Sequence, residues 1–315
     1  MIHAYQSLIS PMQKTFIYSD PVRHALETGG PVLALESTII AHGMPYPENL
    51  EFAHEAEKRA FDHGATPATI AILGGQVCIG LNADQLYKLA TDPNVGKVAT
   101  REIGLALAQK LHGATTVSST MRLAHLAGIK VFATGGIGGV HRGADTNFDI
   151  SADLIELGRT SVIVVSAGAK AILDLPKTLE YLETMSVPVI GYACSEFPAF
   201  YSRKSGLPIP VRMDEARVIA EAFIHQRQLG IRAGILIANP VPEEYEISFG
   251  EMDVHIREAL DDAKQAGIDG KRLTPFLLGR IVELTQGRSL KTNRALALNN
   301  VKLGAEIAQK LAELA

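Results

Sequence analysis

The sequence predicts an α/β protein: a three-layer α/β/α arrangement around a central mixed, largely parallel sheet, followed by a helical C-terminal region. Short runs rich in β-branched residues alternate with segments of helical periodicity over most of the chain. The strand runs are almost continuously apolar, which is typical of strands buried on both faces. From Glu251 onward the periodicity is helical only.

The pattern places seven strands along the chain: Val32–Glu36, Ala68–Leu73, Ala114–Val117, Ile129–Thr134, Ser161–Val165, Val187–Tyr192 and Gly234–Ile237. Seven helices follow or separate them: Glu48–Asp62, Ala83–Ala90, Arg101–Leu111, Thr120–Leu126, Asp153–Leu157, Ala171–Thr184 and Glu215–Gln228. Three more helices are expected at the end: Met252–Gln265, Pro275–Leu284 and Asn293–Leu314. Asn82 is a typical N-cap, and Gly113, Gly128 and Gly230 suit helix C-termini.

The bulk properties indicate one folded domain. The 315 residues contain 47% hydrophobic and 20% charged residues, which argues against disorder. No repeat or linker divides the chain, so we expect a single α/β domain over residues 31–315, after an N-terminal tail and first helix in residues 1–30.

Charge and cysteine content exclude several classes of protein. The net charge is −4 and no run of Lys or Arg occurs, so a nucleic-acid partner is not expected and the substrate is expected to be small. No apolar stretch is long enough to span a bilayer, and the first residues lack a secretory signal, so we expect a cytoplasmic protein without a membrane partner. The two cysteines, Cys78 and Cys194, indicate neither a disulfide framework nor a zinc cluster.

Polar clusters follow four of the expected strands. Because ligands bind at the carboxyl ends of strands in open α/β sheets, these clusters are the candidate site. They are Glu36-Ser37-Thr38, Thr134-Gly135-Gly136, the segment from Ser166 to Lys170, and Asn239-Pro240.

Glu36 and Lys170 carry the strongest chemical hypotheses. A carboxyl group at the mouth of an apolar strand is partly desolvated, which suits a general acid; a helix-capping or ion-pairing Glu is the alternative. Lys170 follows a run of small residues that permits close approach of a ligand. Its amine would bind phosphate or, if desolvated, attack an aldehyde to form an imine, whereas the alternative is a lysine that reaches solvent from a helix start.

Two further segments favour an anionic ligand. Residues 134–143 contain five glycines in ten positions, as expected of a loop that turns its N–H groups toward an anion or of a structural turn. Residues 115–120 carry five hydroxyls where a strand passes into a helix, which indicates an anion pocket or ordinary capping.

The remaining candidates are single side chains near these segments. Asp149 and Asp153 would suit a hard divalent cation, Mg²⁺ or Mn²⁺, although Asp153 also fits a first helical turn. His141 would contact a phosphate or a hydroxyl, or lie exposed. Lys97 flanks a passage from strand to helix and is otherwise a surface cation, and Asn293 would cap the last helix.

Together these segments resemble the pseudouridine-5'-phosphate glycosidase family, also called indigoidine synthase A-like. The matching stretches run from about Pro31 to the C-terminus: residues 34–45, 64–71, 113–117, 130–153, 166–170 and 274–278. They are long and unusual in composition, so the resemblance is specific. The N-terminal tail lies outside it.

The resemblance implies a homotrimeric α/β/α enzyme that splits pseudouridine 5'-phosphate into uracil and ribose 5-phosphate, with one Mn²⁺ per subunit. It implies that Lys170 is the nucleophile and Glu36 the proton donor, and it places Asp149 at the metal. The positions that it implies for substrate binding are Lys97, Val117, Thr134, His141, Ser151, Ala152, Asp153 and Asn293. Some relatives carry a fused sugar kinase; this chain is too short for one, so we expect a separate pseudouridine kinase to supply the substrate.

Two alternatives stay open on sequence grounds. Another imine-forming enzyme would act on a different sugar phosphate, and a sugar-phosphate-binding protein would need the phosphate pocket but not both Glu36 and Lys170. The absence of the His-Glu-x-x-His and Gly-x-Ser-x-Gly patterns leaves metalloprotease and α/β-hydrolase functions without support.

Overall fold

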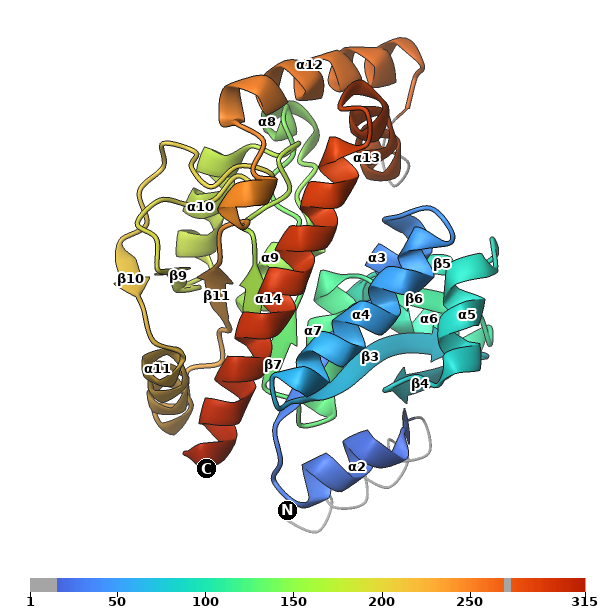
Figure 1. Cartoon of the computed structure of the whole chain (residues 1–315), viewed down its shortest axis with the longest axis vertical. Coiled ribbons are helices and arrows are strands. Elements are labelled where there is room, and N and C mark those ends of the chain that lie inside the picture. The colour runs from blue at the N-terminus through green and yellow to red at the C-terminus, as the bar shows by residue number, and fades with distance from the viewer. Residues whose placement is uncertain (1–15, 269–272, 315) are drawn as a thin grey trace.

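The computed structural model describes residues 16–268 and 273–314 (Figure 1). The strands of this part are β1 (Phe16–Tyr18), β2 (Val32–Leu35), β3 (Thr66–Leu73), β4 (Gln76–Ile79), β5 (Gly96–Val98), β6 (Gly113–Thr115), β7 (Val131–Ala133), β8 (Ile163–Ser166), β9 (Val189–Tyr192), β10 (Val211–Met213) and β11 (Ile235–Ala238). All seven predicted strands are present. Glu36 and Thr134, expected as final strand residues, lie one position beyond β2 and β7.

The helices also follow the predicted pattern. They are α2 (Asp20–Glu27), α3 (Thr38–His42), α4 (Glu48–Asp62), α5 (Ala83–Thr91), α6 (Ile103–Ala108), α7 (Val117–Leu126), α8 (Ala144–Asn147), α9 (Ala152–Leu157), α10 (Leu175–Thr184), α11 (Ala216–Gln228), α12 (Phe249–Gln265), α13 (Leu273–Leu284) and α14 (Arg288–Glu313). Each predicted helix has a counterpart here.

The sheet is mixed and largely parallel, as predicted. Its strand order is β1-β4-β3-β2-β7-β8-β11-β9-β10, with β6 beside β3 and β5 beside β6. Among these pairs only β4 and β6 run antiparallel to their neighbour β3. The central strands β2, β7, β8 and β11 are fully buried, which explains their continuous apolar sequences.

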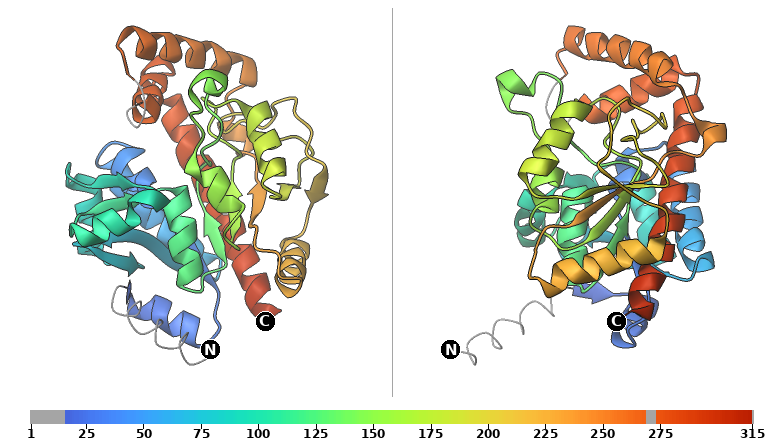
Figure 2. Two further views of the ribbon diagram at one scale, coloured as in Figure 1. Left: turned by 180° about the vertical axis from the view of Figure 1, so that it is seen from behind. Right: turned by 90° about the vertical axis from the view of Figure 1, so that its left-hand side faces the viewer.

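Helices cover both faces of the sheet and so complete the three layers (Figures 1 and 2). The long helix α14 packs on β2, β7 and β8, between α4 and α11. The opposite face carries α7, α9 and α10. No helix of the described residues is long and apolar enough to cross a membrane.

Two local predictions were wrong. Gly113 does not end a helix but begins β6, because the preceding helix stops at Ala108. Asn293 does not cap the last helix, since α14 begins five residues earlier, after Gly287, whose φ is +80°. Asn293 therefore lies inside a helix with its side chain buried.

At the N-terminus, residues 1–15 of the expected tail lie outside the described residues. The next residues join the sheet, because β1 pairs in parallel with β4. Helix α2 then packs against β2 and β3.

Candidate active site

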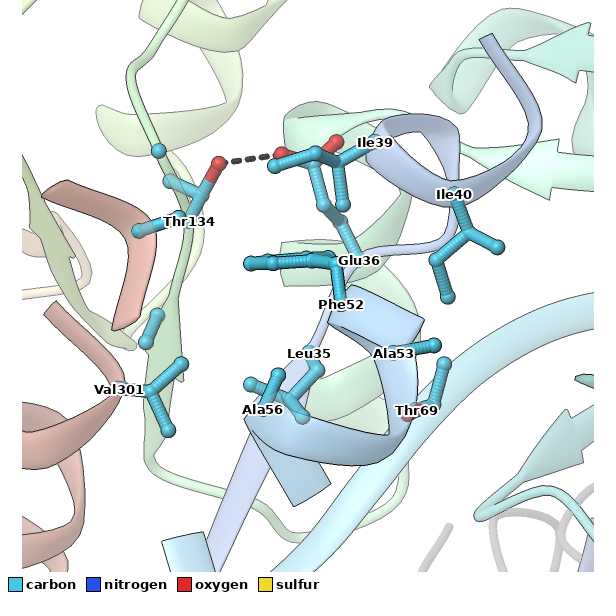
Figure 3. Close-up of a pocket in the computed structure, with 13 residues that line it drawn as sticks. Leu35, Glu36, Ile39, Ile40, Phe52, Ala53, Ala56, Thr69, Thr134 and Val301 are labelled. Carbon is cyan, nitrogen blue, oxygen red and sulfur yellow. Dashed lines mark hydrogen bonds between the residues drawn. The ribbon is translucent and has the colours of Figure 1, made fainter. Parts of the chain in front are cut away.

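The site begins with two side chains that leave neighbouring strands at the same edge. Leu35 of β2 pairs with Ala133 of β7, so the next residues, Glu36 and Thr134, emerge side by side. The Thr134 hydroxyl donates a hydrogen bond to Glu36 Oε1 (Figure 3). The parallel register therefore fixes the orientation of the Glu36 carboxyl group.

Glu36 stands at the edge of an apolar crevice (Figure 3). The crevice encloses only about 20 Å³, room for roughly one water molecule. The apolar side chains that line it include Leu35, Ile39, Ile40, Phe52, Ala53, Ala56 and Val301. Burial raises the pKa of Glu36 above its ordinary value, and the nearby Lys170 ammonium and the Thr134 hydrogen bond oppose this effect. A carboxyl group with a raised pKa suits the role of a proton donor.

Lys170 reaches the same place from β8, the strand on the other side of β7. The chain turns through Gly168, whose φ is +79° and where a Cβ would lie 2.2 Å from the carbonyl oxygen of Pro198. The Lys170 N–H then donates to the Ile137 carbonyl, at 3.0 Å. Within residues 16–268 and 273–314, no ion pair holds the Lys170 amine, so it can reach a ligand.

Two chambers meet at Glu36 and Lys170. The outer chamber has a volume of about 330 Å³ and is lined mainly by polar side chains. The inner chamber is about 50 Å³ and is walled by Ile39, Phe200, Pro275 and Leu278 together with glycine backbone. Both chambers are lined by Glu36, Thr38, Lys97, Lys170 and Thr274. Such a pair of chambers would suit a ligand made of a polar part and a planar, less polar part. The bond that connects the two parts would lie at the boundary between the chambers.

The structure brings the predicted site residues together around these chambers. The outer chamber is lined by Lys97, Val117, His141, Asp149, Ser151, Ala152 and Asp153. Asn293 lines the inner chamber. Thr134 lies next to Glu36, to which it is hydrogen-bonded.

The glycine-rich loop, residues 134–143, uses several of its N–H groups for bonds within the protein. Five of its N–H groups have protein acceptors: those of Thr134, Ile137, Gly138, Val140 and His141. At least two of its glycines are needed for close packing. A Cβ at Gly138 would lie 2.2 Å from Ser151 Oγ, and one at Gly136 would lie 2.5 Å from the Phe200 ring.

Asp153 holds two parts of the site with its carboxylate. Its Oδ1 accepts from the N–H of Ser118, at the start of α7, and its Oδ2 accepts from the N–H of Gly138, both at 2.8 Å. The carboxylate is buried and both oxygens are occupied, so Asp153 fixes the walls of the outer chamber.

The hydroxyl-rich segment 115–120 is likewise engaged mainly with the protein. The Thr115 hydroxyl donates to the Ile70 carbonyl at 2.6 Å, and the Ser119 hydroxyl donates to the Val98 carbonyl at 2.6 Å. Ser37, directly after Glu36, joins this network through Ile70 and Thr115. These bonds tie the ends of neighbouring strands together.

Asp149 and His141 lie next to each other on the wall of the outer chamber. His141 Nδ1 lies 3.8 Å from Asp149 Oδ2, and the Asp149 side chain is 42% exposed. Burial lowers the pKa of His141 and the Asp149 carboxylate opposes this. The described residues contain no group of three or more His, Cys, Asp or Glu side chains that could hold a metal. This donor set would therefore fit only a hard cation that takes most of its ligands from water or substrate oxygens.

Sequence reasoning assigned no role to His42, the last residue of α3. It lines the inner chamber, and its Nε2 is buried with no hydrogen-bond partner. Asn293 Oδ1 is orphaned in the same way. The sequence did offer one signal for a role of His42, because this residue lies within residues 34–45, a stretch that carries the family resemblance.

Known proteins resemble this chain over nearly its whole length. Residues 21–310 match the model of the family described as indigoidine synthase A like protein. The pseudouridine-5'-phosphate glycosidase of Solibacter usitatus is 58% identical over 293 residues, 93% of this chain and 98% of its own. The enzyme of the same name from Caldanaerobacter subterraneus is 54% identical over 303 residues, 96% of this chain and 99% of its own.

Two solved structures share the fold. The prealnumycin C-glycosynthase AlnA, solved in complex with ribulose 5-phosphate, superimposes with a TM-score of 0.88 at 37% identity, covering 95% of this chain and 97% of its own. An indigoidine synthase A-like protein from Thermotoga maritima gives a TM-score of 0.86 at 37% identity, covering 94% of this chain and 96% of its own.

Proposed function

This chain belongs to the indigoidine synthase A-like protein family, and from that premise we propose that it is a pseudouridine-5'-phosphate glycosidase. The reaction is the reversible cleavage of the carbon–carbon glycosidic bond, which gives uracil and ribose 5-phosphate. The observation that carries the proposal is the placement of Glu36 and Lys170 where the two chambers meet. Relatives above 50% identity bear this enzyme's name.

The chambers match the two halves of the substrate. We assign the ribose phosphate to the polar outer chamber, where Lys97 and Arg101 supply positive charge and Ser151 a hydroxyl. The inner chamber, with its apolar walls, takes the planar uracil ring. The bond to be cleaved then lies at the boundary, beside both Glu36 and Lys170.

A carbon-linked base is a poor leaving group, so the two-carboxylate route of O-glycosidases does not suit it. In the proposed mechanism, Glu36 gives its proton to the ribose ring oxygen and the C1'–O bond opens. The Lys170 amine adds to C1' and loses a proton. Its nitrogen lone pair then forms a C=N bond as the C1'–uracil bond breaks, the released electron pair takes a proton at the uracil carbon, and water hydrolyses the imine to free the aldehyde and the lysine.

We further propose that Asp149 is the protein carboxylate that binds one Mn²⁺ per subunit, with water and substrate oxygens as the other ligands. Its half-exposed position on the outer chamber supports this. A bound divalent cation would supply positive charge that orients the sugar phosphate. Lys97 and the chamber wall that Asp153 fixes position the substrate independently of this cation.

The cellular setting is also proposed. We expect a cytoplasmic homotrimer that receives its substrate from a separate pseudouridine kinase. Size-exclusion chromatography with light scattering on the purified chain tests the trimer directly.

The activity is tested by incubating the protein with pseudouridine 5'-phosphate and Mn²⁺ and measuring uracil by chromatography. We expect stoichiometric uracil and ribose 5-phosphate, and no cleavage of uridine 5'-phosphate. AlnA was solved with a ketose phosphate, so ribulose 5-phosphate is a useful second sugar. Imine formation with that sugar but no release of uracil would indicate a different sugar-phosphate enzyme.

A further inference from the structure

His42 lines the inner chamber and carries a ring nitrogen without a hydrogen-bond partner. This residue ends α3, the short helix that follows Glu36, and so belongs to the same strand end as the acid. Its Nε2 is buried without a partner. A buried polar atom left unpaired is destabilising, so a ligand that supplies the missing partner gains affinity there.

The protonation state of the ring follows from its other contact. The backbone of Val95 favours the protonated form of the imidazole, and because Nε2 has no partner, we assign this contact to Nδ1–H. Burial and the nearby Lys97 ammonium lower the pKa of His42, which favours the neutral ring at neutral pH. A neutral imidazole that donates from Nδ1 presents Nε2 as an acceptor.

The base of the proposed substrate offers the matching donors. Uracil linked through carbon keeps both of its ring N–H groups, whereas uracil linked through nitrogen has only one. We propose that His42 Nε2 accepts a hydrogen bond from a ring N–H of uracil, which makes His42 a specificity-determining residue for the base. This rests on the proposed function and adds to it the means of recognising the base.

Position supports the assignment. His42 lines the inner chamber but not the outer one, so its contact is with the base and not with the sugar phosphate. Its partner Val95 lies two residues before Lys97, which lines both chambers. The same segment thus fixes the His42 tautomer and supplies a cation at the boundary.

The test compares pseudouridine 5'-phosphate with its N1-methyl and N3-methyl analogues, each of which lacks one N–H. The wild-type protein should favour the parent over at least one analogue by about 100-fold or more in kcat/KM, because an unpaired buried acceptor rejects a ligand without the donor. In His42→Ala this selectivity should fall below about tenfold, through a large loss on the parent and little loss on that analogue. His42→Phe keeps the ring size and carries the same expectation, so a folding defect in one variant leaves the other.

His255→Ala is the matched control, since His255 Nδ1 is also buried without a partner but the residue lines neither chamber. It should leave the selectivity unchanged. Borohydride trapping of ribose 5-phosphate should also be unchanged in the His42 variants, because the sugar chamber is untouched. Unchanged selectivity against both analogues in folded His42 variants would overturn the inference, whereas failure of the wild-type protein to cleave the parent would overturn the proposed function instead.

Discussion

The Thr134 hydroxyl donates a hydrogen bond to the Glu36 carboxyl group across the paired ends of β7 and β2. The bond favours the ionised carboxylate, while the surrounding apolar side chains favour the protonated acid. Burial, the nearby Lys170 ammonium and this hydrogen bond together set the pH range in which Glu36 can donate a proton.

Replacing Thr134 with valine should therefore move the alkaline limb of the kcat/KM profile to higher pH. Without the hydroxyl, the pKa of Glu36 rises further, and the acid keeps its proton to a higher pH. We expect kcat/KM below that limb to fall roughly 3- to 10-fold from loss of one hydrogen bond. Thr69→Val is the control, because Thr69 lines the same crevice but donates to Glu57. An unmoved alkaline limb in Thr134→Val would exclude Glu36 as the titrating acid.

Glu36→Gln should abolish cleavage and stabilise the fold, increasingly so at higher pH. The folded protein holds the Glu36 proton more tightly than the unfolded chain does, because burial raises the pKa. The stability of the wild type therefore declines as the pH rises from the pKa of Glu36 in the unfolded chain through its pKa in the folded protein. The amide of the variant does not titrate. The Tm difference between variant and wild type, measured by calorimetry, should grow from pH 4 to pH 8. A constant difference would contradict the raised pKa.

Asp153→Asn should damage both stability and activity. The amide can accept at one oxygen only, so one of the N–H groups of Ser118 and Gly138 faces another donor. We expect a loss of about 2 kcal/mol in the free energy of unfolding and a lower kcat/KM. Asp145→Asn, which alters an exposed carboxylate, should change stability by less than about 0.5 kcal/mol. Equal effects of the two substitutions in urea denaturation would show that Asp153 does not hold the chamber wall.

The strands were predictable where burial dictated their composition. The central strands are apolar on both faces and stand out in the sequence. The strands β1, β5 and β10 are short and only partly buried, so burial did not dictate their composition. Strand β4 had a signal that was not used: Gly74 and Gly75, both with positive φ, form a two-residue turn between β3 and β4.

The site was predictable only in part. Glu36 and Lys170 follow buried strands, so their meeting follows from the parallel sheet. The glycine-rich loop was ambiguous because the side chains that crowd it, such as Ser151 and Phe200, come from other parts of the chain. The accepting nitrogen of His42 depends on Val95, 53 residues later by sequence number, and no local pattern encodes that contact.

The most direct test of the central claim is to trap the imine at Lys170. The protein is incubated with ribose 5-phosphate, reduced with borohydride, and analysed by intact mass and peptide mapping, with Lys97→Arg and Lys170→Arg in parallel. The mechanism predicts one sugar phosphate per chain on the peptide that contains Lys170, retained in Lys97→Arg and lost in Lys170→Arg. An adduct on another lysine, or uracil release by Lys170→Arg at the wild-type rate, would contradict it.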